Sequence, residues 1–76
     1  MKSTCKITET GAKIWLNKYG KIHREDGPAI EYTDGTICWY IDNCWIHPVK
    51  AIDDPIIQSK YPELIAAIAV YLVYNS

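Results

Sequence analysis

The chain is 76 residues long, with 49% hydrophobic residues, 22% charged residues and a formal net charge of −1 at pH 7. This length allows one small domain, residues 1–76, which buries only about 60% of its unfolded surface and is expected to need an oligomer, a partner or a disulfide for stability. The charge balance argues against nucleic-acid binding through phosphate contacts, because such binding requires a basic surface.

Turn-forming residues divide the first two thirds of the chain into short segments. They recur every seven to nine residues, at Gly11, Gly20, Gly27, Gly35 and Asn43. Asp-Gly pairs are strong hairpin signals, because Gly adopts positive φ and Asp bonds to its own backbone. The segments between the turns are rich in Ile, Thr, Trp and Tyr, which favours strands. We therefore predict about six short antiparallel strands, at residues 5–9, 12–17, 21–24, 29–33, 36–41 and 44–47.

A shift of 24 residues aligns this part of the chain with itself. The aligned pairs are Gly11 with Gly35, Trp15 with Trp39, Gly20 with Cys44, Ile22 with Ile46 and His23 with His47. A unit of this length corresponds to two short strands and two turns, and an internal repeat sets the architecture. We expect structural roles for the residues of this frame and of its turns, namely Gly11, Trp15, Gly20, Gly27, Pro28, Gly35, Trp39 and His47.

The rest of the chain indicates helices. Asp54 followed by Pro55 has the residue types of an N-cap and a first helical position. A second helix is expected to start after Ser59 or Tyr61, with Pro62 in its first turn. The two helices are predicted at residues 55–59 and 63–75, within a helical segment 54–75.

The second helix has no charged or strongly polar residue between residues 64 and 74. These eleven residues are too few for a bilayer, which needs about 20, and the basic face of a membrane-surface helix is missing, so we expect no membrane contact. A helix that is apolar all round must be covered all round. We expect the sheet to cover Leu64, Ile65, Ile68 and Leu72, and a partner or second copy to cover Ala67, Val70, Tyr71 and Tyr74. The alternative is that a curved meander wraps most of the helix.

Together these features predict an α+β fold. An antiparallel β-meander of about six short strands, built from 24-residue hairpin repeats, is expected over residues 3–50. One or two C-terminal helices follow and pack on one face of the sheet.

The cysteines predict free thiols. Their odd number, without a signal-peptide pattern, favours the reducing cytoplasm of the cell that makes the protein. Cys5 and Cys38 occupy positions typical of buried strand residues, whereas Cys44 lies at a turn. The cysteines and the two His lack the paired spacing of a zinc site, so we expect no metal and no cofactor.

The segment "YGKIHREDGPAIEYTDGTICWYIDN" resembles the HREDGPA-type repeat of many small bacteriophage and bacterial proteins, which is similar to the MORN-type repeats that form β-hairpin arrays. The match covers about residues 11–47. It is specific in the first copy, at His23, Arg24, Asp26, Gly27, Pro28 and Ala29, whereas the second copy departs from the pattern after His47. The resemblance implies hairpin repeats and a phage or prophage origin, and it implies no catalytic residue or cofactor.

The "HRED" run has three interpretations. His23 next to carboxylates could act as a general base, and Arg24 could hold an anion. We favour a structural role, because neighbours on a strand point to opposite faces and Asp26 can accept turn N–H bonds. Binding of a ligand or partner through His23, Arg24 and Asp26 comes second, and catalysis is a distant third.

The Trp residues divide into two groups. Trp15 and Trp39 hold equivalent repeat positions, so we expect them on the same side of neighbouring hairpins, preferably in the core and alternatively as a stacking platform. Trp45 aligns with Lys21, an exposed type of position, and is the better candidate for an exposed aromatic anchor.

The function expected from the sequence is a non-enzymatic protein–protein interaction module, a phage-encoded inhibitor of a host or anti-phage defence protein in the host cytoplasm. The expected contact residues are Trp45, His23, Arg24, Asp26, Tyr71 and Tyr74, and a homo-oligomer is expected to form through the apolar C-terminal helix. The alternative is an oligomeric binder, or sponge, of a nucleotide-like ligand. An enzyme is the least favoured class, because no nucleophile motif, phosphate-binding loop or paired-carboxylate motif is present.

Overall fold

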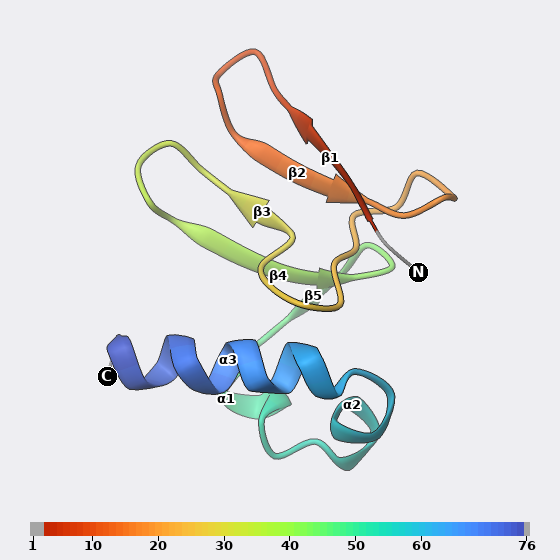
Figure 1. Cartoon of the computed structure of the whole chain (residues 1–76), viewed down its shortest axis with the longest axis vertical. Helices are drawn as coiled ribbons and strands as arrows, with labels where there is room; N and C mark the ends of the chain where they lie inside the picture. Colours follow the sequence, from red (N-terminus) through yellow and green to blue (C-terminus); the bar gives the residue numbers. More distant parts are fainter. Residues whose placement is uncertain (1–2, 76) are drawn as a thin grey trace.

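A meander of five antiparallel strands forms the first half of the protein, in a computed structural model that describes residues 3–75. The strands are β1 (Thr4–Ile7), β2 (Lys13–Leu16), β3 (Ile30–Glu31), β4 (Ile37–Ile41) and β5 (Cys44–Ile46). Each strand pairs with the next one, in the order β1-β2-β3-β4-β5 (Figure 1). The α+β class and the meander are confirmed, with five strands in place of about six. Residues 1, 2 and 76 of the predicted domain lie outside the described residues.

The missing sixth strand is the segment at residues 21–24. It makes only an isolated bridge, between Leu16 and Ile22. Its backbone passes the end of β3 and joins the strands on either side, because the His23 N–H donates to the Trp15 carbonyl (2.9 Å) and the Arg24 N–H to the Tyr40 carbonyl (3.2 Å). The segment therefore holds β2 and β4 together without forming a ladder of its own.

The β1–β2 and β3–β4 turns have the same hydrogen-bond pattern at a shift of 24 residues. The Thr8 N–H donates to the Ala12 carbonyl and the Tyr32 N–H to the Thr36 carbonyl, each at 2.8 Å. Gly11 and Gly35 occupy the same place in these turns, with φ of 90° and 92°. Non-Gly residues rarely adopt such angles, which accounts for both glycines. Membership of a repeat family stays a prediction.

The turn after β4 is one residue shorter than the turn at the equivalent place after β2, and this changes the register of β5. In the first unit the His23 N–H bonds to the Trp15 carbonyl. In the second, the two-residue turn of Asp42 and Asn43 closes the hairpin earlier, and Trp39 pairs with Ile46. A shift of one residue moves every later side chain to a different position. As a result His23 is buried, with 6% exposure, whereas its sequence counterpart His47 is exposed.

Three helices follow the sheet: α1 (Pro48–Ala51), α2 (Pro55–Lys60) and α3 (Pro62–Tyr74). The predicted cap of α2 is confirmed, since the Asp54 carboxylate accepts the Ile56 N–H at 2.9 Å. The N-cap of α3 is Tyr61, one of the two expected starts. α1 was not predicted: residues 48–50 belong to this four-residue helix and not to the meander. Among the described residues, no helix combines the length and apolar character needed to cross a membrane.

The core lies between α3 and the β4–β5 end of the sheet. It consists of Trp39, Ile41, Ala51, Leu64 and Ile68. Figure 1 shows the helices gathered beside β4 and β5, at the opposite end of the molecule from β1. All four residues of β1 are exposed, because no element among residues 3–75 covers this edge strand.

The face of α3 that packs on the core differs in part from the prediction. Leu64 and Ile68 are buried and Leu72 packs against the core, as expected. The prediction was wrong for Ala67 and Tyr71, which also pack against the core. The reason is helical periodicity, because positions three, four, seven and eight residues after Leu64 share its face. Val70 and Tyr74 are 57% and 83% exposed, as predicted, and Ile65 is half-buried.

Candidate functional site

The side chain of Arg24 is held in place by contacts with four residues of its own chain. Its guanidinium carbon lies 4.0 Å from the centre of the Trp15 ring. Its Nε donates to Asp26 Oδ1 (2.9 Å), and its Nη1 donates to the Pro28 carbonyl (3.1 Å) and to Glu31 Oε2 (3.3 Å). Two carboxylates, a carbonyl and an aromatic ring therefore share one cation, whose side chain is 23% exposed.

Gly27 and Ala29 complete this cluster. A Cβ at position 27 would lie 2.9 Å from Arg24 Cζ, so the guanidinium would have to shift if residue 27 carried a side chain. Ala29 is fully buried between β2 and β4: its carbonyl accepts the Trp15 N–H, and its own N–H donates to the Cys38 carbonyl. Trp15 and Trp39 lie on the same face of the sheet, because cross-strand neighbours share a face. Trp39 is in the core, whereas Trp15 is half-buried beneath Arg24.

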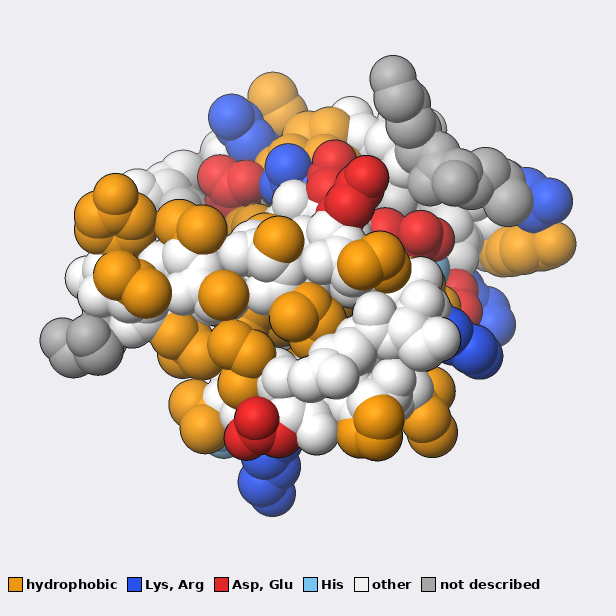
Figure 2. All heavy atoms as spheres, turned by 60° about the horizontal axis from the view of Figure 1, so that its bottom comes forward, with side chains coloured by type: hydrophobic (Ala, Val, Ile, Leu, Met, Phe, Trp, Pro, Cys, Tyr) orange, Lys and Arg blue, Asp and Glu red, His pale blue; other side chains and the backbone are white. Residues whose placement is uncertain are grey.

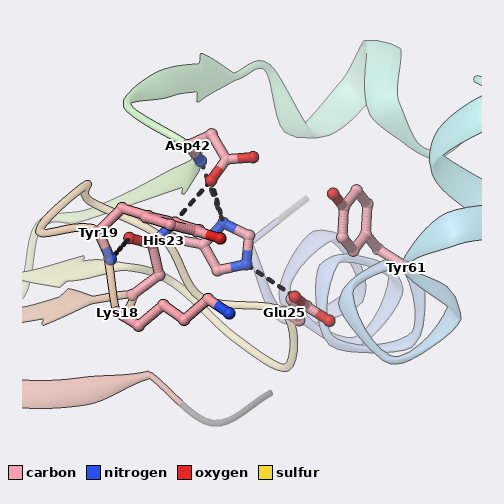
Figure 3. Close-up of a pocket in the computed structure, with 7 residues that line it drawn as sticks. Lys18, Tyr19, His23, Glu25, Asp42 and Tyr61 are labelled. Atoms are coloured by element: carbon pink, nitrogen blue, oxygen red, sulfur yellow. Dashed lines mark hydrogen bonds and ion pairs between the residues drawn. The ribbon is translucent and has the colours of Figure 1, made fainter.

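His23 lies beside a cavity on the other side of this corner. Figure 3 shows its ring between Asp42 and Glu25, with Tyr61 across the cavity. The Asp42 N–H donates to Nδ1 (3.1 Å), so a neutral ring carries its proton on Nε2, which donates to Glu25 Oε2 (2.8 Å). The Tyr61 ring meets His23 edge-on at 6.2 Å. The cavity holds about 200 Å³ and is lined by Asn17, Lys18, Tyr19, His23, Glu25, Asp42 and Tyr61.

The β4–β5 turn is tied to this corner by two side-chain bonds. Asn17 Nδ2 donates to Asp42 Oδ1 (2.7 Å), and Asn43 Oδ1 accepts the Ile22 N–H (2.7 Å). Asp42 and Asn43 both have positive φ, at 48° and 66°, which these residue types tolerate in a two-residue hairpin. The turn residues thus hold His23 and its cavity in place.

The geometry favours a structural role for most of the "HREDGPA" motif. Both ring nitrogens of His23 already have partners, so neither is free to exchange a proton with a substrate. Arg24 directs Nε and Nη1 to its own chain, which leaves only Nη2 for an anion, and the carboxylates of Asp26 and Glu31 beside it oppose anion binding. Among residues 3–75, no group of three His, Cys, Asp or Glu could hold a metal ion.

Tyr61 has a perturbed titration at this site. Burial raises the pKa of its phenol, and the negative charges of Asp42 and Glu25 raise that pKa further. Sequence reasoning missed Tyr61, because it was considered only as a helix start. Asp42 was recognised only as a turn residue. No sequence signal joins residues 23, 42 and 61, which lie in three separate connecting segments that the fold brings together.

The other predicted contact residues lie elsewhere. Trp45 is 55% exposed, as expected, and its ring meets that of His47 at 5.4 Å. Tyr71 stacks edge-on against Trp39 at 5.6 Å and is therefore a core residue first. Cys38 is half-buried and Cys44 exposed.

Cys5 is exposed, contrary to the buried position predicted for it. It belongs to the exposed strand β1, whose sequence resembles that of a half-buried strand.

Comparisons with known proteins show no significant similarity: no family model matches the chain, and no curated protein or solved structure does.

Proposed function

We propose that the protein is a small, non-enzymatic protein–protein interaction module. The observation that carries the proposal is an exposed row of uncharged residues along α3, spaced four residues apart: Pro62, Ala66, Val70 and Tyr74, here called the outer ridge. Residues at this spacing form one continuous ridge on a helix, which packs into a groove of a partner helix or surface.

The outer ridge is part of a wider apolar surface. Figure 2 shows hydrophobic side chains gathered along the exposed side of α3. Residues 64–74 contain no charge that would keep this side hydrated. Contiguous exposed apolar surface of this kind marks interaction sites in small proteins.

The total surface supports the same proposal. The chain exposes 5219 Å². A monomer of 8.7 kDa is expected to expose about 4,700 Å², so the excess is roughly 500 Å². One side of a standard interface covers about 800 Å². The excess is therefore somewhat more than half of the area that one side of a standard interface covers.

The resemblance of residues 11–47 to phage and bacterial repeats makes an inhibitor of a host or anti-phage defence protein, acting in the host cytoplasm, the specific form of this proposal. A nucleotide sponge is not favoured, because Arg24 is engaged by Asp26, Glu31 and the Trp15 ring. The outer ridge can also pair two copies of the chain, as the homo-oligomer expected from the sequence requires.

A pull-down from bacterial host lysate with three forms of the protein tests the proposal. Wild type is expected to capture a partner that Val70→Lys loses, because a charge in the middle of the outer ridge opposes its burial. Ile7→Lys places the same change on β1, where Ile7 is 69% exposed, and is expected to retain the partner. Circular dichroism should confirm that all three forms are folded.

Retention of every captured protein by Val70→Lys would overturn the proposal. Light scattering separates the two occupants of the outer ridge. A wild-type dimer that Val70→Lys converts to a monomer would assign the outer ridge to a second copy.

A further inference from the structure

The cavity beside His23 adjoins a second hollow that reaches the outer ridge. The second hollow holds about 300 Å³ and is lined by Glu25, Lys60, Tyr61, Pro62 and Glu63. The two share Glu25 and Tyr61 as lining residues. The two hollows are together called the Tyr61 groove here, and Pro62, where the outer ridge begins, also lines the second hollow. A partner that covers Pro62 at the start of the outer ridge therefore also contacts a residue that lines the second hollow.

Carboxylates with unused oxygens line the Tyr61 groove. Glu25 uses Oε2 for His23, and Asp42 uses Oδ1 for Asn17. Within the described part of the chain, the second oxygen of each carboxylate makes no hydrogen bond. In the second hollow Glu63 adds a third negative charge and Lys60 adds a positive one, so that with Lys18 the groove has three carboxylates and two lysines. Each of these oxygens can accept a charge-assisted hydrogen bond from an incoming cation.

Aromatic rings form other parts of the wall. Tyr19 and Tyr61 line the first hollow, and Tyr61 also lines the second. The site already holds one cation of its own, because Lys18 Nζ lies 5.1 Å from the centre of the Tyr19 ring. Figure 3 shows the Lys18 chain running toward Glu25 beneath His23. Rings together with carboxylates are the combination that recognises ammonium and guanidinium groups.

We infer that the Tyr61 groove binds an organic cation, the basic side chain of a protein that docks on the outer ridge. The cation lies against the Tyr61 ring and bonds to the outer oxygens of Glu25 and Asp42. The identity of the donor rests on the proposed function, whereas recognition of the cation rests on the groove alone. A bare metal ion does not fit, since residues 3–75 contain no group of three suitable ligands.

Lys18 allows a second test of the inference, because it lines the first hollow and its ammonium competes with the incoming cation for that space. Removing a carboxylate charge should weaken binding of a cation. Removing the Lys18 charge should strengthen it, by relieving repulsion and opening the first hollow. If the affinity for the cation depended only on the net charge of the protein, the position of the removed charge would make no difference.

Two-dimensional NMR titrations with n-butylammonium and methylguanidinium, at constant ionic strength, test the inference. We expect saturable shifts centred on Tyr61, Glu25 and His23, and none from n-butanol, which has the same alkyl chain without the charge. Shifts that rise linearly without saturation, or that n-butanol reproduces, would overturn it.

Matched variants locate the site. Glu25→Gln and Asp42→Asn keep an oxygen for His23 and for Asn17, and each is expected to weaken cation binding roughly tenfold. Glu9→Gln makes the same change at an exposed position outside the groove and should leave the affinity unchanged. Lys18→Gln should tighten binding, and Lys50→Gln should not.

Equal effects of Glu25→Gln and Glu9→Gln would contradict the inference. Should either groove variant fail to fold, Tyr61→Leu provides the same test. Because these titrations need no partner, their failure would leave the test of the outer ridge intact. Conversely, a partner that Val70→Lys loses and Glu25→Gln retains at full affinity would support the interaction module and overturn the assignment of the cation to that partner.

Discussion

The guanidinium of Arg24 lies 4.0 Å above the ring of Trp15, and this contact organises the corner between β2 and β3. In the sequence, Arg24 is the first motif residue without a counterpart, since residue 48 of the second copy is Pro48. In the structure its partners come from β2, from β3 and from the turn between them. The corner is therefore held by a cation at its centre.

Replacing Arg24 should destabilise the protein. Arg24→Ala is expected to lower the free energy of unfolding by about 1–3 kcal/mol, because it removes the ring contact and leaves Asp26 and Glu31 without their cation. Arg24→Lys should lose part of this, because an ammonium lacks the planar fork. Urea denaturation followed by Trp fluorescence measures both. Lys21→Ala, an exposed neighbour, should stay within about 0.5 kcal/mol of wild type.

Gly27 and Arg24 should be energetically coupled. A methyl group at position 27 would lie 2.9 Å from Cζ and 3.1 Å from Nε of Arg24. Gly27→Ala is therefore expected to be destabilising alone and nearly neutral in the Arg24→Ala background. A double-mutant cycle should give a coupling of about 1 kcal/mol. Additive effects would show that the guanidinium does not fill the space beside Gly27.

Asn43 should stabilise the protein in two ways, through its backbone angle and through its side-chain hydrogen bond. Its φ of 66° suits Asn or Gly, and its Oδ1 accepts the Ile22 N–H at 2.7 Å. Asn43→Ala loses both and is expected to cost about 2 kcal/mol. Asn43→Gly keeps the backbone angle, so it should cost about half as much. Equal costs in thermal unfolding would mean that the side-chain bond alone carries the effect.

Tyr61 should make stability fall at high pH. Burial and the charges of Asp42 and Glu25 raise the pKa of Tyr61 above its ordinary value of 10.0 in the folded state. Below that value the phenol is protonated in both states, and its contribution to stability is fully present. Above it the unfolded chain loses this proton first, so the contribution disappears as pH rises through the folded pKa.

Tyr61→Phe has no phenol proton to lose. The free energy of unfolding, measured from about pH 9 to about pH 11, should fall less steeply for this variant than for wild type. Glu25→Gln should fall between the two, because it removes one of the charges that raise the Tyr61 pKa. Identical slopes for wild type and Tyr61→Phe would show that the phenol titrates alike in both states.

Local features of the sequence determined much of the fold. Gly at positions needing positive φ predicted the turns at Gly11, Gly20 and Gly35. Asp54 and Pro55 predicted the start of α2, and the uncharged run at residues 64–74 predicted a helix with an unusual exposed face. These outcomes depend on residues only a few positions apart, and short-range sterics and hydrogen bonds decide them.

The tertiary structure alone decided which residues meet. The one-residue difference in turn length, which buries His23 and exposes His47, depends on pairing between strands. The stacking of Arg24 on Trp15, nine residues apart, and the meeting of His23, Asp42 and Tyr61 depend on contacts between separate segments of the chain. Periodicity and propensity report what a residue does to its neighbours in the chain. They do not predict which distant carboxylate or ring will contact that residue. The contacts of Arg24 and the lining of the Tyr61 groove both depend on such distant partners.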